Sequence, residues 1–203
     1  MNSKIIIAAC LIVIIAIAGF FLMSQKPEYP DIQNPTPFKG NESAKVIVEE
    51  FSDFQCPACI ATEPYIEEIY KQFQDSVKLE FKQFPLSIHN YAQKAAEASF
   101  CAQDFGKFWE YHGELFKANG QLDNASLVKV AKGLGIDEAK FQNCLASGKK
   151  QARVQQDITE GTALGVNGTP TFFVNGEKVE GTFLSEIIKN LRIKIEQKIA
   201  EAQ

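Results

Sequence analysis

Several features that would assign this 203-residue chain to other functional classes are missing from its sequence. It has no basic run or stripe of Lys and Arg, and its formal net charge of −4 is mild, so nucleic-acid binding is not expected. Only two histidines occur, His89 and His112, and neither has a partner motif, so neither is assigned to catalysis. No internal repeat is found, and the length and the 45% apolar content suit one globular domain.

Cysteine is also sparse, with five residues, of which Cys10 lies in an apolar segment. The other four are Cys56, Cys59, Cys101 and Cys144. A second close-spaced pair is missing, whereas four-thiolate zinc sites usually contain two such pairs, so zinc is the less favoured interpretation. The two-residue spacing favours pairing of Cys56 with Cys59, and Cys101 with Cys144 follows by exclusion. A purely structural Cys56–Cys59 bridge is also less favoured, because it would close too short a loop to remove much unfolded-chain entropy.

The N-terminal segment is a candidate membrane helix. Residues 5–23 contain no charged side chain, and about 20 such residues span the hydrocarbon of a bilayer. Lys4 precedes them, so residues 1–4 are expected in the cytoplasm and the rest of the chain outside it. We expect a transmembrane anchor, and a cleaved signal peptide with a small-x-small pattern at residues 16–18 is the alternative. Both interpretations export the domain to the periplasmic or extracellular side, where disulfides persist.

A proline-rich stretch follows the apolar segment. Four of the eight prolines fall within residues 24–43, which contain few large apolar side chains. This composition predicts an extended and fairly stiff linker. We therefore expect one folded domain over residues 44–203.

The close-spaced cysteines lie at the junction of a predicted strand and a predicted helix. Residues 45–51 are rich in β-branched side chains, and apolar residues recur every three or four positions from Pro57 onward. Proline suits the first turn of a helix, so Cys56 is expected to cap it. The unpaired N–H groups and the dipole of a helix N-terminus favour an anion, which should lower the pKa of Cys56. Cys59 returns to the same face within bonding distance and can resolve a mixed disulfide.

Further elements can be predicted along the chain. Residues 77–84 alternate apolar and polar side chains and predict a strand parallel to the first. Residues 89–164 predict several helices, two of which carry Cys101 and Cys144, and a disulfide between these helices is expected to be structural. Strands at 171–174 and 177–180 flank Asn175-Gly176, which is typical of a β-hairpin, and 183–199 predict a final helix. Pro170 precedes the hairpin at a position that admits a cis peptide.

Taken in order, Cys56-Pro57-Ala58-Cys59, the helical block and the turn Gly168-Thr169-Pro170-Thr171 resemble the DsbA-like branch of the thioredoxin superfamily over about residues 44–200. The resemblance implies an α/β thioredoxin fold, with a mixed central sheet flanked by helices and a helical insertion at about 89–164, here preceded by an N-terminal apolar helix. It implies that Cys56 is the nucleophile and Cys59 the resolving thiol. Pro170 would be a cis-proline beside the dithiol, and Thr169 would present its backbone to a substrate segment.

The resemblance also implies roles for charged residues. Glu50, six residues before Cys56, matches the buried acid that moves protons for the second cysteine, with Lys82 as its candidate partner. Ordinary charges on a strand face are the alternative for both. Ala58 stands where the best-known oxidase motif has a histidine, so we expect a milder oxidant, with a pKa of Cys56 between about 3.5 and about 7.

Together these features predict a membrane-tethered thiol:disulfide oxidoreductase that introduces disulfides into reduced or misoxidised exported proteins. Such an enzyme needs no organic cofactor and no metal, only a membrane or soluble redox partner that resets the dithiol. A reductase or isomerase is the alternative within this class. Outside it, a non-catalytic peptide-binding module of the same fold is the alternative.

Overall fold

The structure is a computed structural model that describes residues 34–202. The predicted anchor at 5–23, residues 1–4 and most of the predicted linker lie outside the described residues. Within the described range, none of the helices combines the length and apolar character that a membrane crossing requires.

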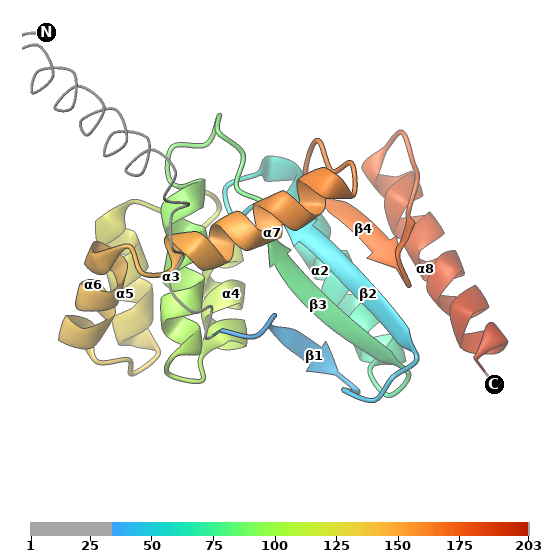
Figure 1. Ribbon diagram of the computed structural model, residues 1–203, viewed down its shortest axis with the longest axis horizontal. Coiled ribbons are helices and arrows are strands. Elements are labelled where there is room, and N and C mark those ends of the chain that lie inside the picture. Colours follow the sequence, from blue (N-terminus) through green and yellow to red (C-terminus); the bar gives the residue numbers. More distant parts are fainter. Residues whose placement is uncertain (1–33, 203) are drawn as a thin grey trace, which may run out of the picture. The chain divides into compact units, whose positions relative to one another are not determined.

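A five-stranded mixed sheet forms the centre of the described domain (Figure 1). Its strand order is β1-β3-β2-β4-β5. β2 (Val46–Ser52) is parallel to β3 (Val77–Gln83) and antiparallel to β4 (Thr171–Val174). The short strands β1 (Phe38–Gly40) and β5 (Glu177–Lys178) pair antiparallel at the two edges. The predicted mixed sheet is therefore confirmed.

Helices cover both faces of this sheet. α2 (Pro57–Phe73) and α8 (Leu184–Glu201) pack together on one face, against a cluster of valines from β2, β3 and β4. α7 (Gln151–Ala163) packs on the opposite face, and Figure 1 shows it in front of the strands with α2 behind them. The contact of α7 with the sheet is close at Gly161, where an added Cβ would come within 2.9 Å of the Phe51 and Phe84 rings. Only a residue without a side chain fits there.

The remaining helices, which come between β3 and α7 in the sequence, form a separate bundle. They are α3 (Ala92–Gln103), α4 (Phe108–Lys117), α5 (Asn124–Gly133) and α6 (Glu138–Ser147). Small residues on α3, such as Ala95 and Ala98, are fully buried and let the neighbouring helices approach closely. The helical block predicted at 89–164 is thus observed, but its last helix, α7, packs on the sheet as well as on α3 of the bundle.

The predicted start of the domain at Ala44 is wrong, because the chain joins the fold about ten residues earlier. β1 lies within the predicted linker and pairs with β3. The backbone N–H of Phe81 donates to the Pro37 carbonyl (3.0 Å), and Trp109 Nε1 donates to the Phe38 carbonyl (2.8 Å). Proline is tolerated before an edge strand, where its missing N–H removes no ladder hydrogen bond. Composition alone therefore did not distinguish this edge strand from a linker.

A side chain of α7 also binds Asn34 and Thr36, at the start of the range that the structure describes. The buried Arg153, which is 4% exposed, donates to the Asn34 carbonyl (3.0 Å) and to Thr36 Oγ1 (3.1 Å). The same guanidinium pairs with the buried Asp157 one turn later on α7. The N-terminal segment of the domain is thus fixed to the helix that covers the sheet.

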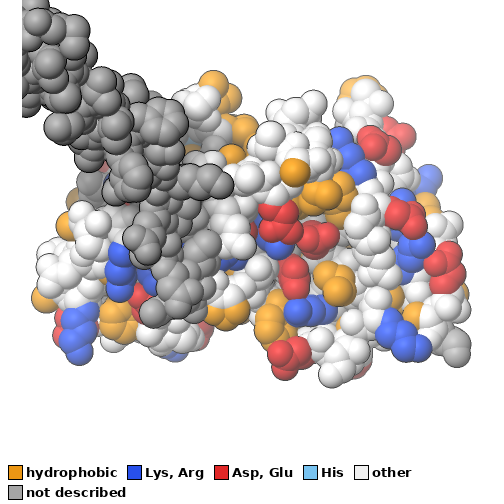
Figure 2. Space-filling model, in the orientation of Figure 1, with side chains coloured by type: hydrophobic (Ala, Val, Ile, Leu, Met, Phe, Trp, Pro, Cys, Tyr) orange, Lys and Arg blue, Asp and Glu red, His pale blue; other side chains and the backbone are white. Residues whose placement is uncertain are grey.

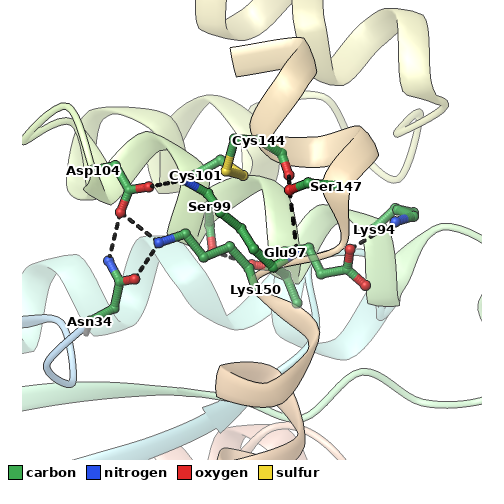
Figure 3. The surroundings of a disulfide bond; sticks show 11 residues. Asn34, Lys94, Glu97, Ser99, Cys101, Asp104, Cys144, Ser147 and Lys150 are labelled. Carbon is green, nitrogen blue, oxygen red and sulfur yellow. Dashed lines mark hydrogen bonds and ion pairs between the residues drawn. A yellow bond between two sulfur atoms is a disulfide. The ribbon is translucent and has the colours of Figure 1, made fainter. Parts of the chain in front are cut away.

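A disulfide joins Cys101 on α3 to Cys144 on α6, with Cα atoms 6.0 Å apart (Figure 3). Beside it, Lys150 Nζ donates to Asp104 Oδ1 (2.6 Å) and to Asn34. The disulfide and this polar cluster together connect the bundle, the start of α7 and the N-terminal segment.

Charged side chains of both signs lie next to one another over the strands on the face shown in Figure 2. On β3, Lys82 Nζ lies 2.9 Å from Glu160 Oε1 of α7 and 3.9 Å from Glu49 Oε1 of β2. These charges are neutralised locally.

We expect the double substitution Cys101→Ala/Cys144→Ala to lower the free energy of unfolding by about 3 to 4 kcal/mol, because it frees a loop of 43 residues in the unfolded chain. Urea unfolding followed by far-UV circular dichroism would measure this. Ser147→Ala is the matched control, since it removes the hydrogen bond to the Cys144 carbonyl and a long one from Lys149 N (3.4 Å) but leaves the bridge, and it should cost about 1 kcal/mol. Equal stability of the double variant and the wild type would contradict a structural role for the bridge.

Candidate active site

Cys56 occupies the N-cap position of α2, with extended backbone angles of φ −71° and ψ 121°. Pro57 follows at the start of the helix, where its missing N–H costs no helical hydrogen bond. Cys56 is 6% exposed and Cys59 is 1% exposed, and both are free thiols. The local sequence thus places two thiols on the first turn of one helix, as expected.

The pKa values of the two thiols are shifted in opposite directions. The hydrogen bond from the Cys59 thiol is the largest cause that lowers the pKa of Cys56, to about 5, against the effect of burial. The nearby Thr169 hydroxyl and the backbone N–H groups of Ala58 and Cys59 lower it further. Burial, followed by the neighbouring Cys56, raises the pKa of Cys59 well above its ordinary value. At neutral pH the pair therefore holds one thiolate, on Cys56, and one thiol, on Cys59.

The loop before β4 lies against the nucleophile. The Thr169–Pro170 peptide bond is cis. Cys56 Sγ lies 3.3 Å from the Thr169 carbonyl oxygen, to which Cys56 donates when it is protonated. Among the described residues, the buried Thr169 Oγ1 has no hydrogen-bond partner, so its hydroxyl is available to the thiolate. The structure therefore directs both oxygens of Thr169 into the site, whereas the sequence predicted a backbone role toward substrate.

The turn that precedes Cys56 is held by a buried carboxylate. Asp53 is 1% exposed, and its side chain accepts hydrogen bonds from Gln55 N (2.7 Å) and Leu86 N (2.9 Å). His89 Nδ1 lies 2.7 Å from the same carboxylate. Sequence reasoning missed Asp53 and found no partner for His89, because the two meet across 36 residues of chain.

Gln55 supports the same turn from another side. Its side chain donates to the Gly120 carbonyl (3.0 Å) and accepts from Tyr91 N (2.6 Å). The residues before the nucleophile are thus bound to two loops of the inserted bundle.

Glu50 lies on β2 and is 3% exposed. Burial raises its pKa to about 7, while the Ser52 hydroxyl and the charge of Lys39 act in the opposite direction. A carboxyl with this pKa can both take and release a proton near neutral pH. The interpretation of Glu50 as a surface charge is therefore contradicted by its burial.

Lys82 is not the partner of Glu50. The register of β2 and β3 pairs Glu50 with Phe81 and Phe51 with Lys82. Since side chains alternate between the faces of a sheet, Lys82 lies on the other face and pairs with Glu160 of α7. Sequence alone could not give this register.

Three further side chains near the dithiol were missed. Ser52 is fully buried, its Oγ has no hydrogen-bond partner among residues 34–202, and its hydroxyl lowers the pKa of both Glu50 and Cys59. Glu63 lies one turn after Cys59 on α2, and burial, then the charge of Glu50, raises its pKa. Lys39 opposes both shifts from β1. Only Glu63 had a sequence signal, its four-residue spacing from Cys59.

Metal binding was the alternative chemistry for the cysteines. Residues 34–202 contain no group of three or more His, Cys, Asp or Glu side chains arranged to hold a metal ion. A four-thiolate zinc site is contradicted because Cys101 and Cys144 are bonded to each other.

The rate of Cys56 alkylation by iodoacetamide should rise with a midpoint near pH 5, because the thiolate is the reacting species. Mass spectrometry would assign the modified residue. In the Cys59→Ala variant the midpoint should move upward, since the hydrogen bond that lowers the pKa of Cys56 most is removed. A wild-type midpoint near 8.5, that of an ordinary thiol, would contradict the activation of Cys56.

Comparison with solved structures supports the fold. A thioredoxin-like oxidoreductase from Silicibacter pomeroyi DSS-3 is similar with a TM-score of 0.69 and 25% identity, over 80% of this chain and 94% of that chain. The thiol-disulfide exchange protein alpha-DsbA2 from Wolbachia pipientis has the same fold, with a TM-score of 0.67 and 23% identity, over 80% of this chain and 86% of that chain.

Comparison with sequences identifies the family. Na(+)/H(+) antiporter NhaA 1 of Salinispora arenicola is 37% identical over 151 residues, which are 74% of this chain and 23% of the antiporter. The chain thus spans about a quarter of the length of the curated relatives that it matches. A family model described as thioredoxin matches residues 33–191. The chain therefore belongs to the thioredoxin family.

Proposed function

We propose that this protein introduces disulfides into exported proteins by donating a Cys56–Cys59 disulfide. The observation that carries the proposal is the unequal proton affinity of the two thiols, with the pKa of Cys56 lowered and that of Cys59 raised. A stabilised Cys56 thiolate favours the reduced form of the dithiol, so the oxidised form gives up its disulfide readily. This direction of transfer is that of an oxidase.

The first step of the proposed reaction breaks the enzyme disulfide. A substrate thiolate attacks the Cys56 sulfur, a mixed disulfide forms, and the electron pair of the broken bond passes to Cys59. The Cys59 thiolate then takes a proton from the Glu50 carboxyl, which is the proton-transfer role proposed for this buried acid.

The second step releases the substrate. A second thiolate of the substrate attacks the substrate sulfur of the mixed disulfide, and Cys56 leaves as a thiolate. Its low pKa makes it a good leaving group. The substrate has then lost two electrons to the dithiol, and a redox partner must remove them to restore the enzyme disulfide.

The Thr169–Pro170 loop is the proposed place for the substrate segment. It borders a cavity of about 260 Å³ whose lining includes Phe172, Val179 and Ile187. An extended segment lying against the loop would bring its cysteine next to Cys56 Sγ, which is 3.3 Å from the Thr169 carbonyl.

An extracytoplasmic location fits this function. The Cys101–Cys144 disulfide is of the kind that persists in oxidising compartments. We propose that residues 5–23 anchor the domain to the membrane, and that residues 24–33 link the anchor to it.

Cys59→Ala in which Cys56 has first been joined to glutathione by a disulfide should accumulate mixed disulfides with a reduced test protein, because the test-protein thiolate displaces glutathione from Cys56 and no Cys59 thiol is present to resolve the product. Non-reducing electrophoresis would detect them. The double variant Cys56→Ser/Cys59→Ala is the matched control and should form none. If Cys56→Ser alone oxidised the test protein as fast as the wild type, the non-catalytic binding module would be favoured over the enzyme.

A redox titration against glutathione would decide the direction of transfer. We expect a potential between those of thioredoxin, about −270 mV, and DsbA, about −120 mV, because Ala58 supplies no cation to the thiolate. Alkylation of free thiols at each glutathione ratio, followed by mass spectrometry, would give the fraction reduced. A potential below about −270 mV would contradict the oxidase and favour a reductase.

A further inference from the structure

His89 lies in the loop that joins β3 to α3 (residues 84–91), at the same end of the sheet as the dithiol. β2 and β3 are parallel, and their last residues, Ser52 and Gln83, are paired with each other. The segments that follow the two strands therefore start side by side, and one of them leads to Cys56 while the other is the β3–α3 loop (Figure 1). The proposed reaction leaves this histidine without a role.

Two contacts hold the β3–α3 loop against the residues just before Cys56. His89 Nδ1 lies 2.7 Å from Asp53 Oδ2, and Tyr91 N donates to Gln55 Oε1 (2.6 Å). Cys56 N in turn donates to the Asp53 carbonyl (3.0 Å), which closes a turn. The end Cα atoms of such a turn lie within about 7 Å of each other. The His89 ring thus contacts a residue that is one turn away from the nucleophile.

Asp53 determines which nitrogen of the His89 ring carries the proton. Both carboxylate oxygens already accept a backbone N–H, from Gln55 and from Leu86, so the carboxyl group acts as an acceptor and Nδ1 of the ring as a donor. A neutral imidazole has one donor and one acceptor nitrogen, so Nε2 is the acceptor. The buried carboxylate therefore leaves the ring with a basic nitrogen on its other side.

Nε2 of His89 is free to meet another molecule. It has no hydrogen-bond partner among residues 34–202 and is not one of their fully buried polar atoms, and the side chain is 17% exposed. Asp53 is the charged group that pairs with the ring within this range. His112 differs, because it is 3% exposed and its Nε2 is fully buried. His89 is thus the histidine that can exchange a proton at the surface.

We infer that His89 is a catalytic base that takes the proton from the incoming substrate thiol. The inference rests on the proposed function, since it concerns the first step of the same reaction. Only the thiolate attacks a disulfide, and an ordinary cysteine is a thiolate to the extent of only a few per cent at pH 7. A base beside Cys56 lets the un-ionised majority of substrate thiols react as well.

The step balances with the groups already described. The substrate thiol gives its proton to His89 Nε2, directly or through one water molecule, and its sulfur attacks Cys56 Sγ. The bond between the substrate sulfur and Cys56 forms, and the Cys56–Cys59 bond breaks. The electron pair passes to Cys59, which takes its proton from Glu50 as proposed above. His89 then releases its proton to the solvent.

The test compares single-turnover rates at two pH values. Oxidised protein is mixed with an excess of a synthetic peptide that contains two cysteines, and samples are quenched in acid. Alkylation in denaturant and mass spectrometry then give the fraction of protein reduced. His89→Asn keeps an N–H group that can donate to Asp53 but has no base. At pH 7 we expect it to react about 10- to 30-fold more slowly than the wild type, because it uses only the thiolate. At about pH 9.5, where most peptide thiols are ionised, the two rates should be equal.

Three controls show that the site is intact. Asn90→Ala changes an exposed neighbour in the same loop and should match the wild type at both pH values. In reduced His89→Asn the alkylation of Cys56 should keep its midpoint near pH 5. His89→Gln provides the same comparison if His89→Asn does not fold, which far-UV circular dichroism would reveal.

The outcomes separate this inference from the proposed function. A wild-type rate at pH 7 in both His89 variants would overturn the role of His89 alone. A loss of the same size at pH 7 and at about pH 9.5 would also overturn it, because a merely structural contribution does not depend on the ionisation of the peptide. A wild-type protein that transfers no disulfide to the peptide would instead overturn the proposed function.

Discussion

The chemistry of this domain depends on the hydrogen bond between two thiols on the first turn of α2. Cys59 donates to Cys56, so one proton is held by the buried sulfur while the other sulfur keeps its charge. The Thr169 hydroxyl and the free backbone N–H groups of the helix lower the pKa of Cys56 further and strengthen this difference between the two thiols. The nucleophilic sulfur of Cys56 and the protonated sulfur of Cys59 thus lie one helical turn apart.

The rest of the fold holds this turn in place. Asp53 and Gln55 bind the preceding residues to loops of the inserted bundle, so the bundle acts on the site through backbone hydrogen bonds. The sheet brings the Thr169 loop to the same place from the far end of the chain. The acids on β2 and α2, with Lys39 from β1, lie on the face of the sheet that α2 covers, opposite α7. The bundle loops, the Thr169 loop and the sheet therefore all contribute to the surroundings of one dithiol.

Sequence predicted the features that depend on neighbouring residues and missed those that depend on contacts between distant segments. The strand–turn–helix around Cys56 and the hairpin at Asn175-Gly176 depend on neighbouring residues, and both were predicted within one or two residues, although the second hairpin strand is shorter than expected. β1 was missed because its three residues follow prolines and gain stability only by pairing with a distant strand. Lys82 was wrongly assigned to Glu50 for a related reason. The face on which a strand side chain lies depends on register, which sequence alone did not fix.

Gly161 sets how closely one helix can approach the sheet. Its missing side chain allows α7 to sit directly on the rings of Phe51 and Phe84. α7 is followed within a few residues by the loop whose Thr169 carbonyl faces Cys56. A bulkier residue at position 161 would require one of those two rings to move or to be replaced by a smaller side chain.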